Sequence, residues 1–169
     1  CIVSWNTRQL LSDCLETLYA DPQAVDWEVI VVDNGSQDGS PEAVRRDFPQ
    51  VDLVESGENL GFSGGNNLAL ARAQAPYLLL LNPDTLVETG ALGQLVDFVE
   101  ARPEIGVAGP MLLNADQSLQ LSCGIAPSLQ TETIHKLLLH KVFPMFKLGR
   151  WDHRQIRPAG WVSGACILV

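Results

Sequence analysis

The apolar residues of this 169-residue chain fall into short runs that alternate with helical patterns as far as Pro110. These runs predict strands at Cys1–Ser4, Val29–Val32, Val51–Glu55, Tyr77–Leu81 and Ile105–Pro110. Strands that alternate with helices are typical of a mostly parallel sheet with helices on both faces. We therefore predict an α/β fold.

Helices are expected between these strands. Apolar positions at the helical period follow the first strand, at Leu10, Leu11, Cys14, Leu15 and Leu18. A second helix is expected to open with Ser40 as its N-cap, Pro41 at the first helical position and Glu42 in the first turn. Two further helices are predicted at Asn66–Gln74 and Thr89–Ala101.

The regular alternation stops after Pro110. A turn at 114–117 is expected to lead into a short strand at Leu119–Ser122, and Ile134–Phe143 is amphipathic. Residues Gly160–Val169 predict a glycine-containing loop that enters a strand. We expect a single domain over 1–169 with two parts, 1–112 and 113–169. Because Cys1 already stands inside a strand, the N-terminus is expected to be trimmed.

Composition narrows the class of protein. The chain is 46% hydrophobic and 18% charged, as in a soluble globular protein, and no apolar run approaches the roughly 18 residues that span a bilayer. Residues 1–134 carry 5 basic and 19 acidic side chains, which argues against a nucleic-acid partner. No cysteine pair has metal-ligand spacing, and buried free thiols at Cys14 and Cys166 suit a reducing, cytoplasmic compartment.

The end of the chain is basic instead. Residues 135–169 hold 6 basic side chains and 1 acidic one, and in the segment 134–157 the basic residues are mixed with apolar and aromatic ones. Such a segment could contact an anionic membrane at its inner face, or could form a helix packed on the sheet with solvated lysines. The histidines His135, His140 and His153 are not spaced as metal ligands with nearby acids.

The candidate chemistry begins where the run Leu78–Leu81 ends in Asn82-Pro83-Asp84. Four leucines without charge predict a strand buried on both faces. A polar tip on such a strand lies at the carboxyl edge of the sheet, where open α/β sheets bind ligands. Asp84 could there help to hold a divalent cation against a phosphate. The alternative is an ordinary turn, since Asn, Pro and Asp are turn residues.

Polar or small residues follow the other early strands as well. The first strand is followed by Ser4-Trp5-Asn6, the second by Asp33–Gly39 and the third by Asn59–Asn67. Several polar tips at one edge predict a pocket. Asp33 could accept hydrogen bonds from a base or a ribose, or could cap the next turn. Glycines at 61–65 permit close backbone approach to a ligand.

The sequence disfavours two common classes of nucleotide-binding protein, the dinucleotide-binding proteins and the phosphate-loop proteins. No G-x-G-x-x-G follows a strand at the start of a βαβ unit, and no G-K-S/T of a phosphate loop is present.

Five motifs in this order resemble family 2 glycosyltransferases of the GT-A fold, and most closely their rhamnosyltransferase-like branch. They are Ser4-Trp5-Asn6, Val31–Gly39, Glu58–Phe62 with Gly65-Asn66-Asn67, Leu80–Asp84, and Gly160–Cys166. The resemblance implies a Rossmann-like sheet of the GT-A type, with the donor site in 1–112 and the start of the acceptor part in 113–169. A sugar-1-phosphate nucleotidyltransferase of related fold is disfavoured, because Trp5-Asn6-Thr7-Arg8 lacks the glycines of its loop.

The resemblance also implies the activity: transfer of a sugar with inversion from a dTDP- or UDP-sugar to a carbohydrate or lipid-linked acceptor, in polysaccharide biosynthesis, with Mg²⁺ or Mn²⁺. The metal contact falls on Asp84, and Asn82 stands where the family has the first acid of its D-x-D motif. The diphosphate side comprises Asn82 and Pro83, and the acceptor side Trp161, Ser163 and Gly164. The implied nucleotide site comprises Ser4, Trp5, Asn6, Asp33, Asn34, Asp38, Asn59, Gly61, Gly64 and Asn67, with Asp33 on the base.

The catalytic base remains to be assigned. The resemblance places it downstream of the Gly164-Ala165-Cys166 strand, and so beyond Val169. Glu88, Asp97, Glu100 and Glu104 are interpreted as solvated surface residues. The alternative function is therefore a module that binds nucleotide without transferring sugar.

Overall fold

The computed structural model describes residues 1–124, 126 and 155–169. The chain divides into two compact units, Cys1–Ala108 with Gly164–Val169, and Gly109–Ser163. Nearly all of the basic segment 134–157, with its amphipathic stretch 134–143 and its three histidines, lies outside the described residues. In the part of the chain that is described, no helix has both the length and the apolar character needed to span a membrane.

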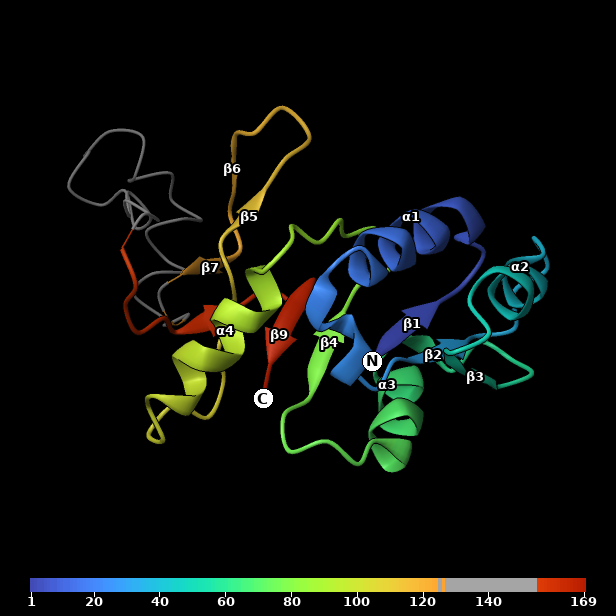
Figure 1. Cartoon of the computed structure of the whole chain (residues 1–169), viewed down its shortest axis with the longest axis horizontal. Coiled ribbons are helices and arrows are strands. Elements are labelled where there is room, and N and C mark those ends of the chain that lie inside the picture. The colour runs from blue at the N-terminus through green and yellow to red at the C-terminus, as the bar shows by residue number, and fades with distance from the viewer. Residues whose placement is uncertain (125, 127–154) are drawn as a thin grey trace, which may run out of the picture. The chain divides into compact units, whose positions relative to one another are not determined.

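The first unit is built on a five-stranded sheet in the order β3-β2-β1-β4-β9. Strands β1 (Ile2–Ser4), β2 (Ile30–Asp33), β3 (Asp52–Glu55) and β4 (Leu79–Leu81) are parallel, and β9 (Cys166–Leu168) runs antiparallel to β4 (Figure 1). The core strand β2 is buried along its whole length, as an apolar run between two helix layers should be. The predicted mostly parallel sheet is confirmed.

Two strand predictions need correction. The segment predicted as a fifth strand, Ile105–Pro110, contributes only an isolated bridge between Ala108 and Leu168. Gly106 and the proline at its end disfavour a regular ladder, and β9 occupies the place beside β4. Of the four leucines before Asn82, only Leu81 is buried. The predicted burial of that strand on both faces is therefore wrong, because β4 is covered less completely than β2.

Helices cover both faces of the sheet, as predicted. Figure 1 shows α1 (Arg8–Tyr19) and α3 (Gly61–Arg72) on opposite sides of β1. The helix α2 (Ser40–Asp47) contacts α1, whereas α3 packs against β1 and β2. The short helix η1 (Pro22–Asp26) follows α1, and α4 (Ala91–Glu100) follows β4. The predicted apolar face of α1 is buried except at Leu10, which is 48% exposed.

Three helix starts differ from their predictions, and α4 begins at Ala91 rather than at Thr89. Helix α3 begins at Gly61 rather than Asn66, although glycine is a poor helix former. A Cβ at Gly65 would lie 2.6 Å from Val3 Cγ1, so the glycines let this helix approach β1 closely. Helix α2 has Gly39 rather than Ser40 as its N-cap, because Asp38 Oδ1 accepts the hydrogen bond from Ser40 N at 3.0 Å.

The second unit contains two small antiparallel pairs. β5 (Leu112–Leu113) pairs with β6 (Leu119–Gln120) across the predicted turn, in which Gln117 has a φ of +65°. β7 (Cys123–Gly124) pairs with β8 (Trp161–Val162). The short strand predicted at Leu119–Ser122 is thus confirmed in its first two residues.

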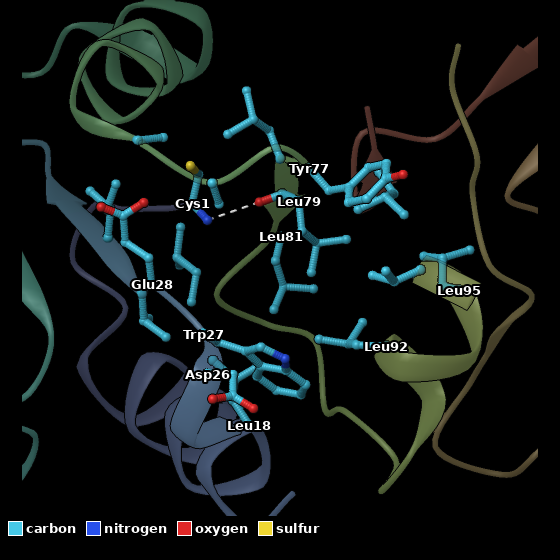
Figure 2. A pocket seen from close by; sticks show the side chains of 18 of the residues that line it. Cys1, Leu18, Asp26, Trp27, Glu28, Tyr77, Leu79, Leu81, Leu92 and Leu95 are labelled. Atoms are coloured by element: carbon cyan, nitrogen blue, oxygen red, sulfur yellow. Dashed lines mark hydrogen bonds between the residues drawn. The ribbon is translucent and has the colours of Figure 1, made fainter. Parts of the chain in front are cut away.

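An apolar cavity of about 250 Å³ lies between β4, α4 and the start of β2 (Figure 2). Trp27, Tyr77, Leu79, Leu92 and Leu95 are among the residues that line it. Trp27 precedes β2 and Tyr77 precedes β4, so the cavity opens at the amino ends of these strands. It lies at the other edge of the sheet from the predicted nucleotide site.

Candidate functional site

The order of the strands creates a crevice at the carboxyl edge of the first unit. From β1 the chain moves to β2 and β3 on one side and returns to β4 on the other, so β1 and β4 flank a topological switch point. Ser4 pairs with Asp33, and Ile2 pairs with Leu81. Since neighbouring strands lie about 4.8 Å apart, the ends of β2 and β4 are separated by roughly 10 Å. The fold thus brings Asp33 and the turn that carries Asp84 to one edge.

Asp33 is the best-ordered acid at this edge. It is 3% exposed, and its Oδ2 accepts hydrogen bonds from Gly35 N at 3.1 Å and Ser36 N at 2.9 Å. Its other oxygen, Oδ1, is buried and meets no donor among the described residues. A buried carboxylate oxygen without a donor is costly. Asp33 therefore caps the turn, as the alternative interpretation held, and keeps one buried oxygen without a hydrogen bond from the described residues.

Asn34 repeats this arrangement. It is 2% exposed, and its Nδ2 donates to Gly61 O at 3.1 Å, which joins the end of β2 to the first turn of α3. Within the described part of the chain its Oδ1 is likewise buried without a donor. Two adjacent side chains thus present unsatisfied acceptor oxygens at the end of β2.

The loops after β1 and β2 are bonded to each other. Asn6, which has a φ of +52°, donates from its backbone to Ser36 Oγ at 2.9 Å, and its Oδ1 accepts from Gln37 N at 2.8 Å. Asp38 Oδ2 accepts from Arg8 N at 2.8 Å. These cross-links fix the loops without any ligand.

Several predicted nucleotide contacts are engaged in this network. Burial is the largest single influence on the pKa of Asp38 and raises it, but the hydrogen bonds from Ser40 and from Arg8 N together outweigh it and hold that pKa below its usual value. The hydroxyl of Ser4 is buried and lies 2.8 Å from Thr7 Oγ1. Trp5, in contrast, is 53% exposed. In this arrangement Ser4 and Asp38 brace the loops, whereas the indole of Trp5 extends into solvent.

The predicted loop Asn59–Asn67 is mostly helical. Asn59 Oδ1 accepts from Gly61 N at 2.8 Å, directly before α3. Gly61, Gly64 and Asn67 lie in the first two turns of that helix, and Asn67 is exposed. These positions therefore bring the amino end of a helix, rather than a flexible loop, to the carboxyl edge.

Asp84 stands in a turn three residues beyond β4. The turn is closed by Thr85 N, which donates to Asn82 O at 3.2 Å, and Asn82 N donates to Ala165 O at 2.9 Å. The turn interpretation of this motif is thus confirmed, and Asp84 is exposed. Asn82 and Pro83 are half-buried. Burial and the negative charge of Asp84 raise the pKa of the Cys14 thiol to about 12.

The residues present are compatible with a cation held jointly by protein and ligand. Within the described residues, no group of three His, Cys, Asp or Glu side chains could enclose a metal ion. Mg²⁺ usually takes one or two carboxylates and completes its shell with substrate phosphates and water. An exposed carboxylate at the switch point meets that requirement, and Asp84 is the side chain that offers it.

The three residues predicted for the acceptor side, Trp161, Ser163 and Gly164, are divided between the two units. Gly164 belongs to the first unit, where an added Cβ would lie 3.5 Å from Phe62 Cζ. The second unit holds Trp161, which packs over Gly124, and Ser163, whose N donates to Ser122 O at 2.6 Å. Phe62, 52% exposed near the start of α3, had no predicted role, and its only signal was an aromatic side chain among glycines.

The acids interpreted as surface residues are exposed. They are Glu88 in the segment before α4, Asp97 and Glu100 on that helix, and Glu104 after it.

Comparison with known proteins gives one family. The family model described as Glycosyl transferase family 2 matches residues 1–137. The N-acetylglucosaminyl-diphospho-decaprenol L-rhamnosyltransferase of Mycobacterium tuberculosis is 32% identical over 160 residues, which cover 83% of this chain and 51% of that protein. The chain therefore spans about half the length of this relative.

Solved structures show the same fold. A mannosyltransferase from Pyrobaculum calidifontis, in complex with GDP-Man and Mn²⁺, matches with a TM-score of 0.61 and 29% identity over 67% of this chain and 34% of that one. TarS from S. aureus, in complex with UDP-GlcNAc, matches with a TM-score of 0.60 and 21% identity over 72% of this chain and 36% of that one. The second likeness shows the fold alone. Together they confirm the predicted GT-A fold class.

Proposed function

Since the chain belongs to glycosyl transferase family 2, we propose that it transfers a sugar from a nucleotide diphosphate sugar to an acceptor hydroxyl. Residues 1–112 hold the donor, and 113–169 begin the acceptor part. The observation that carries this proposal is the convergence of Asp33, with one unsatisfied oxygen, and Asp84 at the switch point of the sheet.

Asp33 selects the base. Uracil and thymine carry a ring N–H that can donate to Asp33 Oδ1, and guanine carries one as well, whereas adenine and cytosine have none on their pairing edge. A site built around an acceptor discriminates against ligands that lack the matching donor. We therefore propose a UDP- or dTDP-sugar as donor. GDP is the necessary competitor in any test, because the Pyrobaculum relative binds GDP-Man.

Asp84 holds the metal side, flanked by Asn82 and Pro83. A Mg²⁺ or Mn²⁺ ion bound there would neutralise charge that grows on the leaving diphosphate. The mannosyltransferase relative was solved with Mn²⁺, which supports this assignment. Asn82 replaces an acid, so the site depends on the diphosphate for more of its ligands.

The proposed reaction is the direct displacement that the family resemblance implies. The acceptor oxygen forms a bond to the anomeric carbon while the bond from that carbon to the diphosphate oxygen breaks, and the electron pair leaves with the diphosphate. Attack opposite the leaving group inverts the configuration. A base takes the acceptor proton. The family resemblance assigns this base to an acid downstream of β9, and the exposed acids Asp97 and Glu100 on α4 have the character of surface residues.

The acceptor is proposed to be a carbohydrate or a lipid-linked sugar. The mycobacterial relative is named for a decaprenol-linked acceptor. Contact of the basic segment 134–157 with an anionic membrane would suit such a substrate. Flotation with anionic liposomes tests this contact, and unchanged flotation after charge reversal of Lys136 and Lys141 would exclude it.

Titration calorimetry tests the donor site directly. We expect UDP or dTDP to bind, to bind more tightly with Mn²⁺, and to bind more tightly than ADP. Equal affinity for ADP would remove Asp33 from base recognition, and no binding of any of UDP, dTDP and GDP would refute the proposed donor site.

A second candidate, a nucleotide-binding module without transfer, is favoured by Asn82 at the place of the first acid. Assay of the full-length protein with nucleotide sugar and acceptor separates the two functions. Release of nucleotide with formation of a glycosylated product supports the transferase, and tight binding without product supports the module.

A further inference from the structure

The segment Asn82–Gly90, which carries Asp84 from β4 to α4, contains no regular secondary structure. Backbone groups outside helices and strands need partners from elsewhere. The segment has two local hydrogen bonds, from Thr85 N to Asn82 O and from Ala91 N to Glu88 O. Asn82 N also donates to Ala165 O at 2.9 Å, just before β9, and the side chains that anchor the segment come from α1 and from Asp21 just beyond that helix.

Three side chains of that region reach the segment at three successive points. Cys14 Sγ lies 3.8 Å from Asn82 O, at the start of the segment. Thr17 Oγ1 accepts from Val87 N at 3.0 Å, in its second half. Asp21 Oδ2 accepts from Gly90 N at 2.6 Å, at its end. Cys14 and Thr17 are three positions apart and share one face of α1.

The contact from Thr17 depends on its hydroxyl. Thr17 Oγ1 donates to Cys14 O at 2.9 Å, which directs its lone pairs away from its own helix. Val87 is buried, so water cannot easily replace Thr17 as acceptor for Val87 N. Valine in place of threonine would keep the shape of the side chain and leave that N–H unsatisfied.

Asp21 fixes the other end. It is 3% exposed, and both of its oxygens are used, Oδ1 by Gln23 N at 2.9 Å and Oδ2 by Gly90 N. Gly90 has a φ of +78° and is the N-cap of α4, so its conformation is one that other residues rarely adopt. Asp21 thereby sets where the segment stops and where α4 starts.

We propose that Thr17 and Asp21 are positioning residues for the metal side of the donor site, because they hold the segment Asn82–Gly90 against α1 and so keep Asp84 at the switch point. This inference rests on the proposed function. Neither residue touches the ligand. A segment that is held before the ligand arrives loses less conformational freedom when it binds, which raises affinity.

Calorimetry of four proteins tests the inference: wild type, Thr17→Val, Thr17→Ser and Thr89→Val. UDP is titrated with saturating Mn²⁺ and again with EDTA, and the ratio of the two affinities is the gain due to metal. Thr17→Val should reduce this gain about tenfold and leave the affinity in EDTA unchanged. Thr17→Ser should restore most of the gain. Thr89→Val makes the same change at an exposed position of the same segment and should have no effect.

A further variant and a second measurement keep the outcomes separate. Asp21→Asn loses one of the two oxygens that accept from Gln23 N and Gly90 N and should lower the gain relative to wild type, so it serves if the valine variant does not fold. Hydrogen exchange of the Val87 amide should be faster in Thr17→Val. An unchanged gain in a folded Thr17→Val protein overturns the inference. If Mn²⁺ does not raise the UDP affinity of the wild type, the proposed metal site is refuted instead. In that case the role of Thr17 is still tested by hydrogen exchange, because unchanged exchange of the Val87 amide in Thr17→Val would overturn it.

Discussion

The two sides of the candidate donor site are constructed differently. On the nucleotide side, at the ends of β1 and β2, Asp33 and Asn34 are buried, and the two loops are bonded to each other. On the metal side, Asp84 is exposed on an irregular segment that is anchored from behind by α1. The proposed nucleotide side is therefore braced by hydrogen bonds within the protein, whereas the proposed metal side would need the diphosphate to supply part of its ligand set.

This difference has a physical consequence for binding. A preformed hydrogen-bonding pocket contributes to affinity whether or not a cation is present. A lone carboxylate contributes mainly through the cation, since an exposed acid and a diphosphate repel each other. A substitution on the nucleotide side should thus lower nucleotide affinity with or without metal, whereas one on the metal side should lower it only when metal is present.

Asp33→Ala should have the largest effect. It removes the acceptor of the base N–H and the cap for Gly35 N and Ser36 N. A hydrogen bond to a charged group is worth about 1.5–3 kcal/mol, so UDP affinity should fall on the order of a hundredfold, equally with Mn²⁺ and with EDTA. Calorimetry under both conditions measures this loss. A loss seen only with Mn²⁺ would place Asp33 on the metal side and break the comparison.

Asp84→Ala should have the next largest effect, and it should depend on metal. We expect the gain from Mn²⁺ to disappear, a loss of about tenfold or more, while affinity in EDTA stays the same or rises slightly because a repelling charge is gone. The exposed position of Asp84 predicts little change in thermal stability. An undiminished Mn²⁺ gain in the variant would remove Asp84 from the metal site.

Much of this division could be predicted from the sequence. Apolar runs followed by a carboxylate predict Asp33 and Asp84 at one edge, because parallel strands place their ends there, although the run before Asp84 is less buried than predicted. The start of α3 at Gly61 could not be predicted, because low helix propensity argues against it and only packing on Val3 favours it. The contact between Thr17 and Val87 spans 70 positions and leaves no periodic pattern.

Gly65→Ala probes how tightly α3 supports the nucleotide side. The new Cβ would lie 2.6 Å from Val3 Cγ1 and 3.3 Å from Asn34 Nδ2. Overpacking costs about 1–3 kcal/mol, and the gain in helix propensity offsets about 1 kcal/mol, so a net loss of about 1 kcal/mol is expected. Urea denaturation measures it.

The neighbouring Gly64→Ala is the matched control for stability. Its Cβ would lie 2.8 Å from Leu60 Cβ, at the start of the same helix, and would have no atom of β1 within 4 Å. We expect Gly64→Ala to lose less stability than Gly65→Ala, because only the first turn of α3 has to shift. Equal destabilisation by both substitutions would show that the close approach of α3 to β1 is not the cause.

The smallest predicted effect is on acid stability. Hydrogen bonds from Ser40 and Arg8 N outweigh partial burial and hold the pKa of Asp38 below 3.8, its usual value. A carboxyl whose pKa is lower in the folded state stabilises the protein above the unfolded pKa, and this contribution is lost as the pH falls through the folded pKa. Asp38 is exposed, so solvent screening keeps the contribution small. Asp38→Asn should therefore lower the melting temperature at pH 6 by no more than about 2 °C, and the difference from wild type should shrink as the pH falls below 3.8 and through the folded pKa. A difference that persists at pH 2 would show that Asp38 braces the β1 and β2 loops through its shape rather than its charge, and would weaken the view that the nucleotide side is held together by charged hydrogen bonds.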